Sequence, residues 1–463
     1  MTPAGEKPAG TGSDRDLAPL PIALPPVEER AAMPAGFRAA GMAAGIKPSG
    51  RPDLMIVATL GEPAAVAATF TTNLVAAAPV RLGQRHLSAT EMGSGGRFGW
   101  ATAVVASSGC ANAATGAAGD ADALEVCRLA AKAVGTDVEH VLPLSTGVIG
   151  VRLPVAKIAA GIEKLAPRLE TTDAAMESAA RCLMTTDTVV KLATTSVGIT
   201  GEDGLPVRVT VSGMAKGVGM IHPRMATMLS VVMTDAACPP DVLFGLLAPI
   251  VQRTWNQASV DGDTSTNDTV FVLASGASGA RPIEAGTADA AALGSAIEAV
   301  ARSLARQQAA DGEGATTLIT CQVSGASDDA DARAIARSVI SSSLFKAAVH
   351  GRDPNWGRVA GAAGNARLPD EALLEAAGLP HVEAVARAGR QPELDAERMR
   401  IAIQGHVVYD GAPLDLDRPA VSRAMDAPEV LVRMDLGLGS GKGEAFGCDL
   451  TEGYVKENAE YTT

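Results

Sequence analysis

The chain has 463 residues, of which 47% are hydrophobic, 20% are charged and only 3% are aromatic. This composition is typical of a globular protein of two or three domains, with cores built from aliphatic side chains. A net charge of -13 argues against nucleic acid as a partner, because phosphate backbones require clustered Lys and Arg.

Neither a membrane nor a secretory route is indicated. No apolar run approaches the roughly 18 residues of a membrane span, and "LAPLPIALPP" near the N-terminus is interrupted by prolines, unlike a signal peptide. The six cysteines are scattered and form no C-x-x-C motif, which favours free thiols in a reducing compartment. We therefore expect a cytoplasmic protein with no metal site and no membrane partner.

The chain opens with a segment rich in Pro, Ala, Gly and charge, and we expect residues 1–33 to be a disordered N-terminal extension. Beyond it, apolar runs of strand length alternate with patterns of helical spacing. In chain order, these are strands over 54–60 and 100–108; helices over 120–135, 155–165 and 173–184; a strand over 228–236; a helix around 240–252; a strand over 269–276; a long helix containing Leu293, Ile297, Val300 and Leu304; and strands over 317–325, 429–437 and 444–451.

This alternation predicts a mixed α/β or α+β fold, although it does not fix the order of the strands. We expect a main layered α/β domain over residues 34–340 and a smaller C-terminal α/β domain over 341–463.

Familiar motifs fail in detail. "GLGSGKGE" (437–444) has three residues where a phosphate loop needs four, and Gly443 stands where Ser or Thr is required. "DGDTSTND" (261–268) begins like a calcium loop, but Thr266 occupies the glycine position and no Glu closes the loop. Its polar side chains indicate a structured turn that could form one wall of a site. The histidines show no metal-binding spacing, and no G-x-S-x-G motif is present.

One hydroxyl stands out in the apolar stretch "GMIHPRMATMLSVVMTDA" (219–236), namely that of Thr227. A buried hydroxyl needs a hydrogen-bond partner. A threonine in such a context is far more often a packing residue than a nucleophile, so the pattern alone leaves the role of Thr227 open.

Several polar clusters, taken together and in order, resemble the ornithine acetyltransferase family, the bifunctional glutamate N-acetyltransferases. The resemblance extends from about Gly36 to Thr463. It rests on "AAGIKPSGRPDL", "STGVIG", "MTTDT", "AKGVGM", "MATML", "DGDTSTND", "DGEGAT", "GRDPNWGR" and "YVKENAEYTT".

The resemblance implies an autoprocessed N-terminal-nucleophile type of layered α/β sandwich, the ornithine acetyltransferase or DmpA-like fold, with a tail that returns to the active site. The precursor would cleave itself between Ala226 and Thr227 into chains of 1–226 and 227–463. Cleavage would create an α-amine with a pKa of about 7.7–8.0 beside the Thr227 hydroxyl. That amine would be the base that a threonine nucleophile needs.

Other matched positions complete the implied site. Thr146 and Gly147 correspond to an oxyanion hole. The substrate-binding residues implied, besides Thr227, are Thr185, Lys216, Glu313, Asn458 and Thr463. Lys216 would face a carboxylate or polarise the site, and Glu313 would face a substrate amine. The ordinary alternatives are solvated loop charges for Lys216 and Glu313 and a frayed tail for the last residues.

The implied reaction is a ping-pong transfer of acetyl from N-acetylornithine to glutamate in arginine biosynthesis, with no cofactor and with acetyl-CoA as a further donor in some members. The partners implied are amino-acid substrates and the two chains of one precursor, arranged as an α2β2 heterotetramer. Three alternatives stay open: a paralogue acting on another N-acyl amino acid, an N-terminal-nucleophile aminopeptidase, and an unprocessed binding protein. Ala106, Ser107 and Cys110 depart from the family pattern and leave the substrate open.

Overall fold

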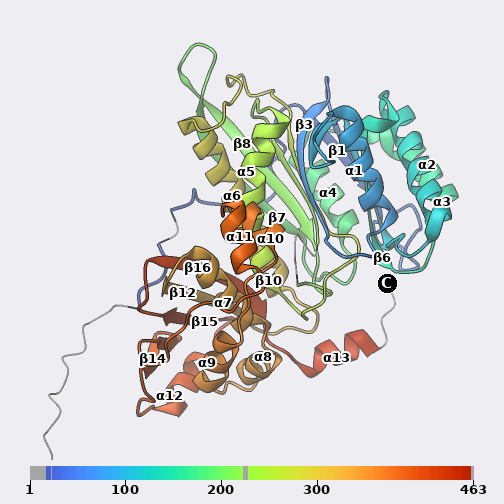
Figure 1. Cartoon of the computed structure of the whole chain (residues 1–463). Helices are drawn as coiled ribbons and strands as arrows, with labels where there is room; N and C mark the ends of the chain where they lie inside the picture. Colours follow the sequence, from blue (N-terminus) through green and yellow to red (C-terminus); the bar gives the residue numbers. More distant parts are fainter. Residues whose placement is uncertain (1–16, 22, 223–227, 460–463) are drawn as a thin grey trace, which may run out of the picture.

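The computed structural model describes residues 17–21, 23–222 and 228–459. They fold into three β-sheets with helices on their faces (Figure 1). The mixed α/β fold expected from the sequence is confirmed. Ala226, Thr227 and Thr463, which the resemblance assigns to the site, lie outside the described residues.

The first sheet has six strands in the order β4-β3-β11-β9-β8-β7. At its centre β9 runs parallel to β11 and antiparallel to β8, and all six residues of β9 are buried. The strands are β3 (Ala64–Phe70), β4 (Phe98–Ala101), β7 (Lys191–Thr200), β8 (Pro206–Lys216), β9 (Leu229–Thr234) and β11 (Thr269–Ala274). Strands that precede residue 226 therefore flank, on both sides, the pair of strands that follow it.

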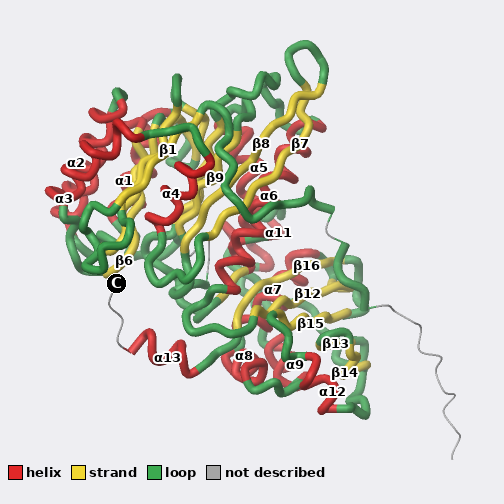
Figure 2. The backbone as a smooth tube through the Cα atoms, turned by 180° about the vertical axis from the view of Figure 1, so that it is seen from behind, coloured by secondary structure: helices red, strands yellow, loops and turns green. Residues whose placement is uncertain are grey.

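The second sheet has the order β1-β2-β5-β6, with β5 and β6 parallel. Its strands are β1 (Phe37–Met42), β2 (Leu54–Thr59), β5 (Ala103–Cys110) and β6 (Val141–Val148). The helix α4 (Asp173–Leu183) packs on β1 and β2 of this sheet and also contacts β8 of the first sheet. Seen from behind, α4 lies between β1 and β9 (Figure 2).

Further helices cover the outer faces of both sheets. On the first sheet, α6 packs against β7 and β8, and α5 packs against β3; on the second, α2 and α3 form the outer layer. The helices are α1 (Ala78–Thr90), α2 (Gly116–Val134), α3 (Val155–Leu165), α5 (Pro240–Arg253) and α6 (Ala288–Ala310), with short 3₁₀ helices at Val138–His140, Ala166–Arg168 and Trp255–Gln257.

The third sheet, of order β10-β16-β12-β15-β13-β14, forms the C-terminal lobe in Figure 1. Its core is shared with α7, α8 and α9. The strands are β10 (Ala258–Ser259), β12 (Leu318–Ala326), β13 (Arg400–Ile403), β14 (His406–Asp410), β15 (Glu429–Asp435) and β16 (Gly441–Cys448). The helices are α7 (Asp329–Ser341), α8 (Ser343–His350), α9 (Trp356–Gly364), α10 (Glu371–Ala376), α11 (His381–Arg387), α12 (Arg418–Ala424) and α13 (Glu452–Ala459). The expected boundary at residue 340 falls in the last turn of α7, and both α7 and α8 contribute to this core.

The long helix α6 joins the first and third sheets. Its Arg302 pairs with Glu444 on β16, and its Arg306 pairs with Glu429 on β15 at 2.9 Å. Both guanidinium groups also lie over the ring of Phe446, at 5.5 and 5.4 Å. Apolar packing on one side of α6 and these ion pairs on the other hold the C-terminal lobe against the layered domain.

The strand predicted over 100–108 is wrong as a single element. The chain leaves the first sheet at Ala101 and enters the second at Ala103, so the run forms the end of β4 and most of β5. Thr102 makes the step between the sheets, where its N–H donates to His140 and its carbonyl accepts from Thr59. The mostly apolar run did not mark the step, because apolar residues continue from the end of β4 directly into β5.

The N-terminal segment expected to be disordered is in contact with the folded domains over part of its length. Glu28 forms an antiparallel bridge with Thr194, and Thr195 donates its hydroxyl hydrogen to the Pro26 carbonyl at 2.7 Å. Further back, the Leu20 N–H donates to Gln322 of the third sheet. Residues 17–21 and 23–33 are thus an extended, proline-containing strap that contacts both lobes.

Candidate active site

The residues assigned to an oxyanion hole lie at the end of β6, where its pairing with β5 becomes irregular. Gly147 has φ of +130°, and a Cβ at this position would lie 2.4 Å from the Gly109 carbonyl carbon. Only glycine fits such an approach of two backbones. The bulge therefore fixes the orientation of the Thr146 side chain and of the Gly147 N–H at the end of β6.

Lys216, the last residue of β8, lies beside this strand end. Its Nζ is 3.3 Å from the Thr146 Oγ1, and Gln308 donates to its carbonyl oxygen at 2.8 Å. Burial lowers the pKa of the Lys216 ammonium. In the register of β8 and β9, Lys216 is opposite Leu229, two residues after Thr227 in the chain.

Glu313 lies in the turn after α6 and is only 7% exposed. Its two carboxylate oxygens accept hydrogen bonds from Thr186 Oγ1 at 2.7 Å and from Asn458 Nδ2 at 3.0 Å. Gly219 leaves room for it, because a Cβ there would lie 2.2 Å from Glu313 Oε2. Lys216 and Glu313 are therefore not solvated loop charges, and α13 brings the chain's C-terminal part to this site through Asn458.

A buried ion network behind the site joins three of its segments. Lys191 Nζ lies 2.8 Å from Asp187 Oδ1 and 2.6 Å from Asp311 Oδ2, and both the Lys191 and Asp187 side chains are 0% exposed. Asp187 also accepts the N–H groups of Gly217 and Thr185, each at 2.9 Å. The network thus connects Gly217, which follows Lys216, and the loop that contains Thr185 to the turn that contains Asp311 and Glu313.

The charges of this network are well compensated. Burial alone would raise the pKa of Asp187, but the ammonium groups of Lys191 and Lys216 lower it to about 2. Lys191 uses its three hydrogens on Asp187, Asp311 and the Val189 carbonyl. Each buried charge therefore has the partners that offset its desolvation.

A second lysine borders the site from the loop 43–53. Lys47 Nζ donates to the carbonyls of Pro52 at 2.8 Å and Met184 at 2.5 Å, the latter directly before Thr185. Burial lowers the pKa of Lys47 to about 8. A Cβ on Gly109 would lie 3.2 Å from Lys47 Cγ, so this loop packs against the strand end that carries the two glycines.

The polar turn 261–268 holds the segment that enters the expected processing site. Asp261 accepts the N–H groups of Met220 and Ile221, the latter at 2.9 Å, and burial raises the pKa of the Asp261 carboxyl. Thr264 donates its hydroxyl hydrogen to the His222 carbonyl at 2.9 Å. Met220 has a left-handed φ of +52°. The interpretation of this turn as one wall of a site is consistent with these contacts.

The described residues matched to the family thus converge: Thr146, Gly147, Lys216, Glu313, Thr185 and Asn458 are linked by the contacts above. The sequence reasoning did not single out Asp187, Lys191, Asp311 or Lys47. A lysine at the start of an otherwise apolar strand, four residues after an aspartate, was the signal available for Asp187 and Lys191.

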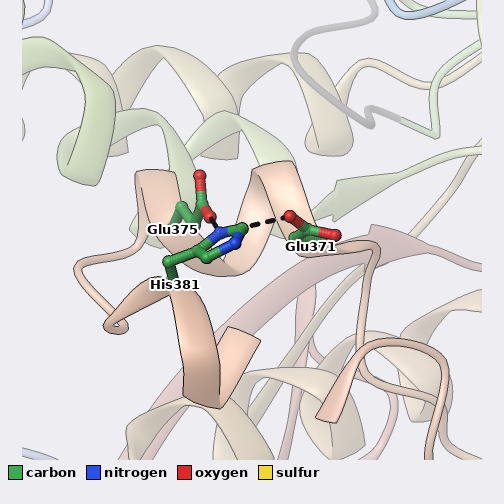
Figure 3. Close-up of side chains that lie close together, drawn as sticks. All are labelled: Glu371, Glu375 and His381. Carbon is green, nitrogen blue, oxygen red and sulfur yellow. Dashed lines mark hydrogen bonds and ion pairs between the residues drawn. The ribbon is translucent and has the colours of Figure 1, made fainter. Parts of the chain in front are cut away.

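A different group has the ligand types of a metal site. Glu371 and Glu375 of α10 and His381 of α11 place one ligand atom each within 4.8 Å of one another (Figure 3). His381 is exposed, and its hydrogen bond with Glu375 raises the pKa of the imidazole. An exposed ion pair between neighbouring helices accounts for this geometry without a metal.

The layered α/β fold, and a site that places one partly buried cation and one buried carboxylate near a glycine-shaped strand end, are those of an enzyme of the acyl-transfer class. Within residues 17–21, 23–222 and 228–459, no helix is long and apolar enough to cross a membrane.

Sequence comparison identifies the family. The model of the ArgJ family matches residues 38–463, and the chain belongs to that family. It is 42% identical to an arginine biosynthesis bifunctional protein ArgJ of Synechocystis sp., over 94% of this chain and 98% of that protein. It is 44% identical to that of Thermus thermophilus, over 93% and 99%. The predicted family is confirmed, and the chain is an enzyme of arginine biosynthesis.

Among solved structures, an ornithine acetyltransferase from Mycobacterium tuberculosis, complexed with ornithine, is 38% identical. The match covers 43% of this chain and 99% of that chain, with a TM-score of 0.38.

Proposed function

We propose that this enzyme transfers the acetyl group of N-acetylornithine to glutamate through an acetyl ester on Thr227. The observation that carries the proposal is the placement of partly buried Lys216, beside the strand end of Thr146 and Gly147, together with buried Glu313. An α-amino acid carries one carboxylate and one α-amine, and ornithine carries a second amine. A site with one cation and one anion matches that charge pattern.

The nucleophile would be created by cleavage between Ala226 and Thr227. The freed α-amine has a reference pKa near neutrality, about 7.7–8.0, and can take the hydroxyl proton. Asp261 supports this step by holding Met220 and Ile221, so the strained approach to residues 223–227 is fixed in one conformation. No histidine is required by this chemistry.

The oxyanion of the tetrahedral intermediate would be held by Thr146 and Gly147. Lys216 donates to Thr146 Oγ1, so that oxygen already accepts a hydrogen bond and its own proton is free to point into the site. A second donor, the Gly147 N–H, would complete the hole. Lys216 thereby adds positive charge close to where negative charge develops.

Each half-reaction conserves atoms and protons. Thr227 Oγ attacks the acetyl carbonyl, its proton passes to the Thr227 amine and then to the departing ornithine nitrogen, and the amide bond breaks. The amine of glutamate then attacks the ester, loses a proton through the same amine, and Thr227 Oγ recovers it. Glu313 would orient substrate amines, with Asn458 fixing its carboxylate and Thr185 and Thr463 as further contacts.

The finer organisation belongs to the same proposal. We place the enzyme in the cytoplasm. Its two chains, 1–226 and 227–463, would form an α2β2 heterotetramer. Each precursor would have a main domain to about residue 340 and a smaller domain after it. The interleaved strands of the first sheet support a lasting association of the two chains, because β9 and β11 lie between β3 and β8.

Initial rates with purified enzyme test the function. N-acetylglutamate should form from N-acetylornithine and glutamate, and double-reciprocal plots should be parallel, as a ping-pong mechanism requires. Thr227→Ala should abolish the reaction, whereas Thr171→Ala, at an exposed threonine, should leave it unchanged. Acetate release without glutamate would indicate hydrolysis instead, and turnover of only another N-acyl amino acid would indicate a paralogue.

A further inference from the structure

A cleft of about 1280 Å³ lies apart from the residues assigned to acyl transfer. Its walls come from α5, α7, the caps and first turns of α8 and α9, and the segment 365–370 that leads into α10. Its volume exceeds the roughly 300–1,000 Å³ usual for sites that bind small molecules. His222 is among its lining residues, so the cleft reaches the segment that enters residues 223–227.

The lining is strongly cationic in a chain whose net charge is -13. Four arginines line it, Arg333, Arg337, Arg358 and Arg367, and Asp370 is the one carboxylate among the described lining residues. The Asp370 side chain accepts the Leu373 N–H as the N-cap of α10. Local charge of one sign in a concave site concentrates ligands of the opposite sign.

Within the described chain, Arg333, Arg358 and Arg367 take part in no ion pair with a carboxylate. Arg358 donates to the Leu344 carbonyl at 2.6 Å, which orients its guanidinium without neutralising it. Burial lowers the pKa of Arg333. Asp329, Asp328 and Glu298 lie near Arg333 and partly offset its charge. Arg358 and Arg367 have no such ion pair among the described residues, so the cleft keeps an excess of positive charge.

Two helices begin at the wall of the cleft. Ser342 caps α8 and Asn355 caps α9, and both caps line it. The positive ends of these helices add to the arginine charge. Gly357 and Gly361 of α9 also line the cleft and leave its surface free of bulky side chains.

We propose that this arginine cleft (Arg333, Arg337, Arg358 and Arg367) binds a small molecule that carries two or more phosphate groups. Four guanidinium groups exceed what one carboxylate of an amino acid needs, and the planar guanidinium fork matches phosphate oxygens in bidentate geometry. Two sources share this chemistry: a free polyphosphate, and a larger carrier whose phosphates form only part of the molecule. The proposal goes beyond the acetyl transfer between amino acids.

Isothermal titration of the purified enzyme with pyrophosphate and, separately, with coenzyme A tests the proposal. We expect saturable binding that weakens with added salt. Arg358→Gln and Arg367→Gln should each weaken binding roughly tenfold or more, since each removes charge-assisted hydrogen bonds. Arg423→Gln, at an exposed arginine on α12 outside the lining, should bind as wild type. Circular dichroism would establish that each variant is folded.

Pyrophosphate binding would support the proposal with a free polyphosphate as the sufficient ligand. Binding of coenzyme A alone, lost in the arginine variants, would support it with a phosphate-bearing carrier. Absence of binding for both probes at millimolar concentration, or binding unchanged in Arg358→Gln and Arg367→Gln, would overturn it. Acetyl transfer between N-acetylornithine and glutamate, measured on the same samples, separates this outcome from a failure of the proposed function.

Discussion

Thr146 depends on two neighbours for its position: the glycine pair that shapes the end of β6, and Lys216, which occupies one acceptor site of its hydroxyl. A side chain placed in this way is pre-oriented before any substrate binds. In the proposed oxyanion hole, such preorganisation would contribute more than the strength of one hydrogen bond.

Thr146→Val tests this role at the scale of one residue. Valine keeps the β-branched shape but removes the hydroxyl donor, so kcat should fall roughly 10²–10³-fold, with little change in KM for N-acetylornithine. Thr146→Ser, which restores the hydroxyl, should recover most of the rate. A Thr146→Val enzyme with wild-type kcat would show that this hydroxyl takes no part in the reaction.

Residue-level prediction from the sequence had a clear limit. The matched motifs gave Lys216, Glu313 and Asn458, which the structure links around one site. Lys47 and Asp311 act through segments that are distant in sequence, and no local pattern announces such a contact. Gly109 and Gly147 illustrate the same limit, because their need for glycine arises only when two strands meet.

At the scale of elements, the site is a junction of strand ends and turns held by the Asp187–Lys191–Asp311 network. Lys191 is the first residue of β7 and Asp311 follows α6, so one ammonium group fixes the end of a helix to the start of a strand. The network positions Gly217 and Thr185 by their N–H groups, and through them it sets the spacing between Lys216 and the Glu313 turn.

Lys191→Met should destabilise the fold by about 3–5 kcal/mol, because it leaves two carboxylates buried without their cation. Glu177→Gln removes an exposed ion pair with Arg181 of the same i,i+4 spacing on α4, and should cost less than about 1 kcal/mol. Urea unfolding measures the change in free energy of unfolding for each substitution. It is done in the Thr227→Ala background, where the chain stays uncut. Equal effects of the two substitutions would contradict the structural role.

Acid should affect this network in a defined direction. The pKa of Asp187 in the folded state is about 2, below its ordinary value of 3.8. Its contribution is therefore present above pH 4 and is lost as pH falls from about 4 towards 2. The stability difference between wild type and Asp187→Asn should shrink across that window.

Element prediction succeeded where hydrophobic periodicity and length agreed. Helix 155–165 matches α3 in both bounds, and the buried strands 54–60 and 269–276 match β2 and β11 closely. The run 100–108 failed because a change of sheet leaves no mark in a continuously apolar stretch. Strand order was beyond the sequence for a related reason, since the neighbours in each sheet come from distant segments.

At the scale of the whole molecule, the order of strands in the first sheet is one in which the proposed cut beside the central strand would leave the fold intact. The pair β9 and β11 follows residue 227, whereas β3 and β8 on either side precede residue 226. Separation of the two chains would break backbone ladders on both flanks and expose the cores on both faces of the sheet. Both core clusters contain residues from before and from after this point in the chain.

The C-terminal lobe adds a second connection between distant segments. The helix α6 contacts the first sheet and pairs with β15 and β16, and the N-terminal strap reaches both lobes. Glu313 and Asn458 therefore come to the site from segments that the C-terminal lobe holds in place, which favours a preformed arrangement of these two side chains.

The central claim, an acetyl ester on a Thr227 freed by cleavage, is tested most directly by denaturing mass spectrometry of enzyme incubated with N-acetylornithine alone. The account predicts two chains, 1–226 and 227–463, with the second heavier by one acetyl group located on Thr227, and loss of that group when glutamate is added. A single unmodified chain of 46.8 kDa, or a cleaved chain that never carries acetyl, would contradict it.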